Sequence, residues 1–139
     1  MTNFGKVGLK TFLQPLKSLL VVFLGGGLGS MIRFAMSRWI SALHSHHFPW
    51  GTLAVNVAAC FALGMIIGLA DHKQIISPTA RLFWTVGFCG GFSTFSTFSN
   101  ETLYLLQSGF TISMVLYVSV SLFLCIAATF SGLYLGENL

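Results

Sequence analysis

Residues 87–99 read GFCGGFSTFSTFS, in the middle of a segment that is otherwise strongly apolar. The adjacent glycines Gly90 and Gly91 weaken a helix at this point, because glycine loses more backbone freedom on folding than other residues. A weakened helix leaves carbonyl oxygens that need other partners. Irregular backbone at membrane depth is tolerated only where protein buries it or water reaches it. Several inward-pointing carbonyls form an oxygen-rich site of the kind that hard cations such as sodium prefer. The stretch therefore predicts an interrupted helix with a binding site attached to it.

The composition predicts that lipid is the main solvent of this chain. Of its 139 residues, 55% are hydrophobic and only 7% are charged, and the mean hydropathy is +0.83. A soluble domain usually carries roughly a quarter of charged residues. A helix that crosses a membrane needs about 20 mostly apolar residues. We therefore expect an all-α membrane protein with a basic N-terminal leader at 1–18 and a transmembrane domain at 19–139, in which four helices span about 19–43, 52–70, 81–106 and 110–135. The third of these helices is expected to be broken at the glycine-rich motif.

The distribution of basic residues predicts the orientation of the N-terminus. With four spans, the N-terminus, the second loop and the C-terminus share one side of the membrane. That side holds Lys6, Lys10, Lys17, Lys73 and Arg81, whereas the other side holds Arg38. The positive-inside rule therefore places the N-terminus in the cytoplasm. Most of this bias comes from the leader, so the remainder of the chain is only weakly oriented.

The repeated triplets after the glycine pair predict an anion path. If the segment is helical, Phe95 and Phe98 lie about 60° apart on one face. The edge of an aromatic ring is electropositive and can face an anion. The hydroxyls of Thr94 and Thr97 lie on neighbouring stripes of the same helix. Each residue alone is explained by packing or by a hydroxyl bonded back to its own helix, but the pattern beside a helix break favours transport.

Two polar residues in the other spans have two interpretations each. Arg33 lies inside the end of the first span, where it either snorkels to the membrane surface or faces a watery vestibule that attracts anions. Asn56 is the one strongly polar residue of the second span, and it either forms an interhelical hydrogen bond or lines a polar path.

Several classes of function are disfavoured by the sequence. The cysteines fall in three different apolar segments, which indicates packing residues rather than a disulfide framework: they are Cys60, Cys89 and Cys125. The histidines of the 44–47 loop have no acidic or cysteine partner nearby and are expected to be exposed rather than metal-binding. The few carboxylates form no nucleophile–base–acid set, so an enzyme is not expected. No basic aqueous face is available for nucleic acid.

These residues together resemble the Fluc/CrcB family of small fluoride channels. The resemblance rests on the 87–99 run, on Gly51-Thr52-Leu53 with Asn56, and on Gly25, Gly29 and Arg33. It extends over the chain from about residue 19 onward. It implies a fluoride-selective passive channel that exports fluoride across the bacterial cytoplasmic membrane and relieves fluoride toxicity. It also implies an antiparallel homodimer with two pores and a structural sodium ion at the dimer centre.

The resemblance also implies roles for individual residues. The sodium ligands would be the backbone carbonyls of Gly90 and Ser93 from each subunit, and Arg33 would lie in the vestibule. Cys125 stands where relatives often have a second serine of a polar track on the fourth helix. The fluoride pore would be lined by Asn56, Thr94, Phe95, Thr97, Phe98 and Ser121. The basic leader departs from the pattern of the family, because its positive charge favours one orientation whereas the subunit of such a dimer must insert in both.

Two other functions remain possible at this point. A four-span multidrug exporter needs a carboxylate within the membrane to exchange protons for cations, and Glu101 is the available candidate. A non-transporting assembly subunit is also compatible with glycine-faced helices that pack closely.

Overall fold

The computed structural model describes residues 3–44, 47–73 and 76–139, and it describes side chains from residue 14 onward except at 72–73. Ser45 and His46 of the histidine loop lie outside the described residues, as do the side chains of Lys6, Lys10 and Lys73. All regular elements within these ranges are helical, as the sequence predicted. They are α1 (Asn3–Ala42), α2 (Trp50–Lys73), α3 (Pro78–Leu82), the π-helical turn η1 (Phe83–Cys89), α4 (Gly90–Phe92), α5 (Phe95–Gln107) and α6 (Thr111–Asn138).

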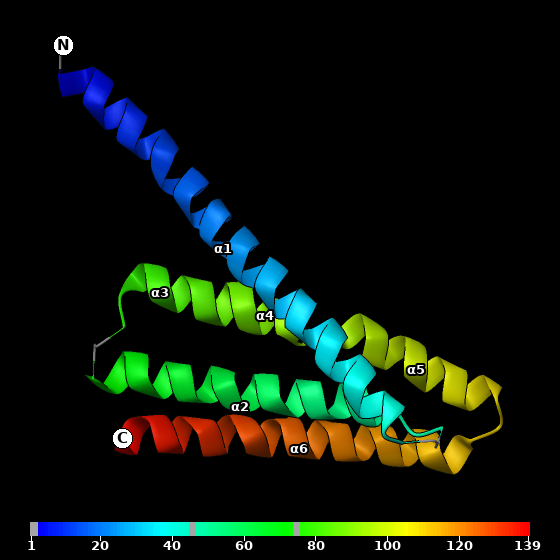
Figure 1. Cartoon of the computed structure of the whole chain (residues 1–139). Coiled ribbons are helices and arrows are strands. Elements are labelled where there is room, and N and C mark those ends of the chain that lie inside the picture. The colour runs from blue at the N-terminus through cyan, green and yellow to red at the C-terminus, as the bar shows by residue number, and fades with distance from the viewer. Residues whose placement is uncertain (1–2, 45–46, 74–75) are drawn as a thin grey trace.

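Three helices of the described chain are long and apolar enough to cross a membrane: Gln14–Ala42 within α1, Trp50–Asp71 within α2, and Thr111–Asn138. The segment expected at 81–106 is instead divided among α3, η1, α4 and α5, which follow one another across the molecule (Figure 1). These helices indicate a multi-pass membrane protein. Helix α1 runs without interruption through residues 18 and 19, where we place the end of the leader.

The interruption of the third segment lies just after the glycine pair and not at it. Gly90 and Gly91 belong to α4, whereas Ser93 and Thr94 are extended, with ψ angles of 158° and 119°. Glycine lowers helix stability by only about 1 kcal/mol, so it does not end a helix by itself. Here α5 begins anew at Phe95, because the Thr94 hydroxyl accepts a hydrogen bond from the Thr97 backbone N–H and caps the new helix.

The longest contact in the molecule joins α2 and α6, which lie side by side and run in the same direction (Figure 1). Gly64 faces the backbone of Thr129, and Gly68 faces that of Leu133; each pair is 65 positions apart in the sequence. A constant offset is expected when two helices pack in parallel, because facing positions then advance together along both chains. A methyl group at Gly64 would overlap the Thr129 carbonyl oxygen, so the glycines permit an approach that no other residue allows.

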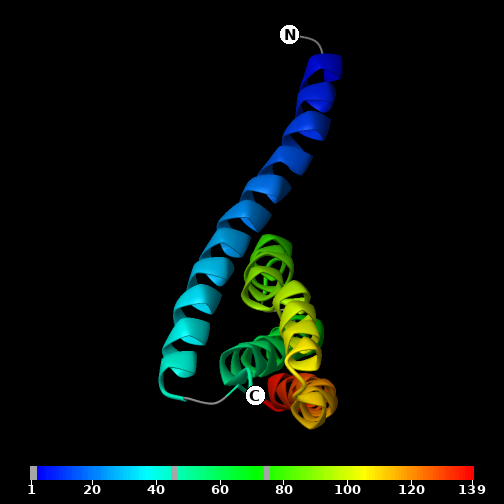
Figure 2. The ribbon, with the colours of Figure 1, turned by 90° about the vertical axis from the view of Figure 1, so that its right-hand side faces the viewer.

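The helix α1 crosses the interrupted segment at a steep angle (Figure 2). Its contact is again made by glycines: Gly25 faces Phe83 and Gly87 of η1, and Gly29 faces the Phe88 carbonyl. On the other helix, Gly91 lies against the backbone of Gly26. Beyond this crossing, α1 extends away from the other helices toward the N-terminus (Figure 1). Gly25 and Gly29, four residues apart on α1, therefore allow the two helices to pack closely.

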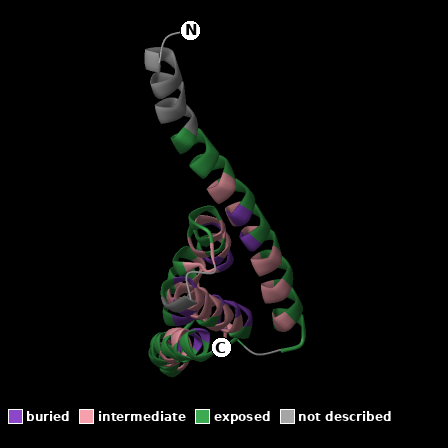
Figure 3. Ribbon diagram, turned by 90° about the vertical axis from the view of Figure 1, so that its left-hand side faces the viewer, coloured by how far each residue is buried: buried purple, intermediate pink, exposed green. Residues whose placement is uncertain are grey.

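Little of the described chain is buried, and the buried residues gather where helices meet (Figure 3). One buried cluster contains Leu53, Leu105 and Tyr117, and a second contains Val55, Ala59 and Phe92. Large apolar side chains remain exposed along α1, α5 and α6. A single chain therefore presents apolar faces suited to lipid or to another membrane chain.

We predict that Gly132→Ala destabilises the fold, because its new methyl group would overlap the Phe61 carbonyl oxygen of α2. Overpacking of this kind costs about 1–3 kcal/mol. Gly27→Ala is the matched control, since no atom lies within 4 Å of its new methyl group. The thermal unfolding midpoint in detergent should fall for Gly132→Ala and stay unchanged or rise for Gly27→Ala. Equal midpoints for the two variants would contradict the close α2–α6 contact.

Candidate functional site

The extended residue Thr94 is held by the side chain of Asn56 on α2. The Asn56 amide donates through Nδ2 to the Thr94 carbonyl at 3.1 Å, and its Oδ1 accepts from the Thr94 backbone N–H at 2.8 Å. One side chain thus pairs with both polar groups of the interrupted backbone, much as a neighbouring strand would. The expectation of an interhelical hydrogen bond from Asn56 is met by these two bonds, which reach backbone rather than a side chain.

The carbonyl of Gly91, on the other side of the break, is bound by α1. Arg33 donates to it through Nε at 3.1 Å, and the Ser30 hydroxyl lies 3.3 Å away. In an uninterrupted helix this carbonyl would accept from the N–H four residues ahead, at Phe95. The guanidinium compensates for the lost bond. Arg33 therefore does not simply snorkel to the membrane surface, because its Nε is anchored at the break.

Two further carbonyls at the break lack their helical donors. The Gly90 carbonyl would accept from Thr94 N–H, but that group donates to Asn56. The Ser93 carbonyl would accept from Thr97 N–H, but that group donates to the Thr94 hydroxyl at 3.2 Å. No atom lies within 4 Å of a methyl group built on Gly90, so the space beside this residue is open in the described part of the chain. Carbonyl oxygens of this kind are ligands for a hard cation.

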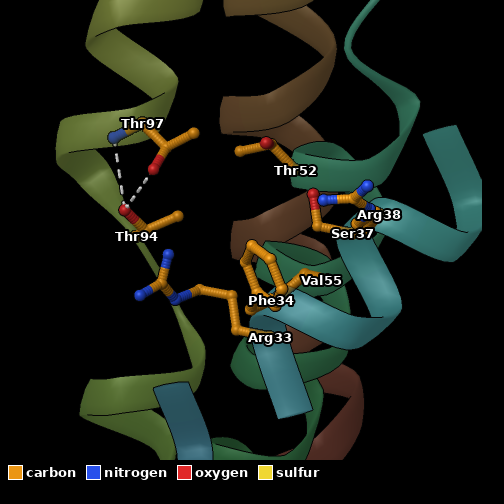
Figure 4. A pocket seen from close by; sticks show the side chains of 8 residues that line it. All are labelled: Arg33, Phe34, Ser37, Arg38, Thr52, Val55, Thr94 and Thr97. Carbon is orange, nitrogen blue, oxygen red and sulfur yellow. Dashed lines mark hydrogen bonds between the residues drawn. The ribbon is translucent and has the colours of Figure 1, made fainter. Parts of the chain in front are cut away.

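A pocket of about 390 Å³ lies between α1 and the Thr94 segment, and we call it the basic pocket (Figure 4). Two of its residues are arginines, Arg33 and Arg38, and among the described residues no carboxylate lines it. Figure 4 shows Arg33 extending from α1 across the pocket toward Thr94. Hydroxyl groups and two apolar residues complete the lining: Ser37, Thr52, Thr94, Thr97, Phe34 and Val55. The positive charge of this pocket attracts anions.

A second pocket of about 480 Å³ lies on the other side of Thr94 and is called the phenylalanine pocket. Phe95 is 80% exposed, and its ring centroid is 5.6 Å from that of Phe98. Its lining comprises Asn56, Cys60, Ser93, Thr94, Phe95, Phe98, Val118, Ser121, Leu122 and Cys125. Because Thr94 lines both pockets, the Asn56–Thr94 pair stands between them.

The hydroxyl of Ser121 is the one unpaired buried side-chain group found in the described part of the chain. Its buried Oγ has no hydrogen-bond partner, and Ser121 is one of the residues that line the phenylalanine pocket. Buried polar groups almost always have a partner, and a bound ion or water is one explanation for an exception. An anion in this pocket would supply the missing acceptor.

The six residues that the sequence predicts for the pore all line one of the two pockets. Asn56, Thr94, Phe95, Phe98 and Ser121 line the phenylalanine pocket, while Thr97 lines the basic pocket. Phe92 of α4 lies apart from these residues: it packs against Phe88 of η1, and the extended residues Ser93 and Thr94 separate it from Phe95 and Phe98 on α5.

Sequence reasoning missed the group of side chains around Glu101. Its carboxylate accepts from the Thr52 hydroxyl at 2.8 Å and from the Tyr117 hydroxyl at 2.7 Å, so it joins α2, α5 and α6. Thr52 lies four residues before Asn56, and Tyr117 four residues before Ser121. This i, i+4 spacing on both helices was the available signal. Ser30 and Cys60 were also missed.

Known proteins resemble this chain along most of its length. A family model described as CrcB-like protein, Camphor Resistance (CrcB), matches residues 20–133. A protein of Phocaeicola vulgatus named Fluoride-specific ion channel FluC is 43% identical over 122 residues, which are 88% of this chain and 100% of the relative. A protein of the same name from Flavobacterium psychrophilum is 38% identical over 124 residues, 89% of this chain and 100% of the relative. Another from Serratia proteamaculans is 50% identical over 94 residues, 68% of this chain and 73% of the relative.

We predict that Asn56→Asp destabilises the fold but keeps one of the two hydrogen bonds between residue 56 and Thr94. A carboxylate still accepts from Thr94 N–H, but it cannot donate to the Thr94 carbonyl, which is left unpaired. The loss should cost about 1–3 kcal/mol of folding free energy. Asn56→Ala should cost more and should also expose the Thr94 amide to hydrogen exchange. Asn100→Asp, at an exposed position of α5, serves as the control. Unchanged unfolding free energies in both Asn56 variants would show that this pair does not hold the break.

Proposed function

The chain belongs to the CrcB-like family, and from this membership we propose that it is a passive, fluoride-selective ion channel. Its relatives are named fluoride-specific channels. The observation that carries the proposal within this chain is the unpaired Ser121 hydroxyl, which shares one pocket with Phe95 and Phe98. A channel performs no covalent chemistry, so the chain is not an enzyme. We further propose that it works in the bacterial cytoplasmic membrane and relieves fluoride toxicity.

The basic pocket attracts a small, strongly hydrated anion, and the phenylalanine pocket replaces its hydration water. The arginines of the basic pocket raise the local anion concentration. In the phenylalanine pocket, the Ser121 hydroxyl and the edges of the phenylalanine rings replace the water of the ion. Among the described residues, no charged side chain lines this second pocket. Fluoride is therefore stabilised there without being trapped, which conduction needs.

A structural sodium ion fits the donor-deprived carbonyls at the break. Gly90 and Ser93 have lost their helical donors to Asn56 and to the Thr94 hydroxyl. Both oxygens are neutral and hard, which suits an alkali cation. When bound, such an ion adds positive potential near the anion path. Asn56 and the capping Thr94 hydroxyl would keep the two carbonyls available by holding the N–H groups that compete for them.

We include in the proposal that two chains associate as an antiparallel homodimer. One chain offers two carbonyls, which leave a cation incompletely coordinated. A twofold axis in the membrane plane brings a second break to the first and doubles the ligands. The exposed apolar faces and the open space beside Gly90 leave room for this contact. Each dimer would then contain two pores.

The rival functions find less support in the site. A proton-coupled exporter needs a carboxylate that is free to bind its cargo, whereas both oxygens of Glu101 accept hydrogen bonds. A non-transporting assembly subunit gives no reason for the unpaired Ser121 hydroxyl. Proton-coupled cation uptake by reconstituted protein would support the exporter, and absence of all transport would support the assembly subunit.

We predict that liposomes containing the protein release fluoride much faster than chloride. Phe95→Ile should lower the fluoride rate by about tenfold or more, which corresponds to ~1.4 kcal/mol in the barrier. The loss follows from the ring edge, which isoleucine lacks. Phe123→Ile is the matched control, because Phe123 is also exposed but lies on α6 outside the pocket. Equal fluoride and chloride rates in the unchanged protein would refute the channel proposal.

We predict that chains insert into the membrane in both orientations. His47 and Thr79 are exposed; His47 precedes the start of α2 and Thr79 belongs to α3, and the start of α2 and α3 lie at opposite ends of the bundle (Figure 1). With Cys60, Cys89 and Cys125 replaced, each single variant, His47→Cys and Thr79→Cys, should be labelled from outside intact cells in about equal fractions. The leader lysines oppose this outcome, at about 1 kcal/mol each. Labelling of only one of the two variants would rule out the antiparallel dimer.

A further inference from the structure

The three cysteines of the chain, which the sequence distributes over three apolar segments, approach one another in the fold. Cys60 on α2 and Cys125 on α6 are 65 positions apart, the same offset as Gly64 and Thr129 one turn further along. They therefore face each other across the contact between α2 and α6. Both cysteines line the phenylalanine pocket.

Cys89 lines a different pocket from the one that Cys60 and Cys125 share. It is buried, and together with Cys60 it lines a separate pocket of about 120 Å³ beside Gly90 and Ser93. It is absent from the lining of the phenylalanine pocket. Among the described residues, no three histidine, cysteine or acidic side chains are grouped so that they could hold a metal ion together.

We propose that Cys60 and Cys125 form a two-thiolate binding site for a soft divalent metal ion in the wall of the phenylalanine pocket. Thiolates select soft ions, and Hg²⁺ accepts two of them in a linear arrangement. Zinc normally takes four ligands and is not served by this pair. The binding itself is independent of what the protein transports, whereas its effect on flux rests on the proposed function.

The charge balance favours this site within the membrane. Each thiol releases one proton to the solvent as its sulfur binds the metal, and no electron is transferred. Two thiolates neutralise one divalent ion, so the product carries no net charge. A buried net charge would be costly in this environment. The glycine contacts of α2 and α6 hold both sulfur atoms at the same level before the metal arrives.

The position of the site predicts a consequence for anion flux. Asn56 and Ser121 lie one helical turn from Cys60 and Cys125 and line the same pocket. A metal ion between the two sulfurs therefore stands next to the unpaired Ser121 hydroxyl. Occupancy should obstruct the pocket, and fluoride release should slow.

The binding test uses purified full-length protein in detergent, HgCl₂ as the probe, and a monothiol competitor to remove loosely held mercury. The unchanged protein and Cys89→Ala should each retain one mercury per chain, measured by elemental analysis and by mercury–thiolate ultraviolet absorption. Cys60→Ser and Cys125→Ser should each bind at least hundredfold more weakly, because each lacks one of the two sulfurs. Retention of mercury by either serine variant, or its loss from Cys89→Ala, would overturn the proposed pair.

The transport test uses the same proteins in liposomes. Mercury should slow fluoride release by the unchanged protein and by Cys89→Ala, and it should leave Cys60→Ser unaffected. Tight binding with undiminished fluoride release would contradict the placement of the site beside the ion path. If no variant releases fluoride even without mercury, the channel proposal fails, while the binding test still decides whether the metal site exists.

Discussion

The pairing of the Asn56 amide with the Thr94 peptide group is the interaction on which the rest of the site depends. It captures one N–H and one carbonyl that an interrupted helix would leave unsatisfied in lipid. By taking the Thr94 N–H, it also removes the donor of the Gly90 carbonyl. By fixing Thr94 in an extended conformation, it lets the Thr94 hydroxyl cap α5 and positions Phe95 and Phe98 at the start of that helix. A single neutral side chain thus stabilises the extended residue between α4 and α5 and leaves the Gly90 carbonyl without its helical donor.

The helices themselves follow from composition and apolar run length, and the sequence predicts them. The place of the interruption could not be predicted, because it is decided by a side chain from another helix. The glycine pair indicated the approximate position of the interruption, but glycine only lowers helix stability and does not fix where a helix ends. The partners of Arg33 and Glu101 were equally hidden, since each bonds to groups far away in sequence. Local patterns identify which residues are unusual for lipid, whereas the contacts of those residues depend on how the helices cross.

The proximity of Cys60 to Cys125 is another contact that local sequence patterns do not predict. Each helix has a readable i, i+4 series: Thr52, Asn56 and Cys60 on α2, and Tyr117, Ser121 and Cys125 on α6. What no single helix reveals is the offset between the two series. That offset is imposed by Gly64 and Gly68, where only one alignment lets the backbones touch. Residues that look like isolated packing positions therefore become neighbours, and a polar stripe forms along the seam of two apolar helices.

The fixed offset between α2 and α6 also constrains how the length of this chain can vary. Adding one residue between Asn56 and Gly64 would rotate the polar series by about 100° relative to the glycine contact. Asn56 would then point away from Thr94 while the helices stayed locked together at the glycines. The same holds for α6 between Ser121 and Gly132. Related chains can therefore gain or lose residues freely in the leader and the connecting loops, but the stretches between the polar series and the glycines must keep a constant number of residues.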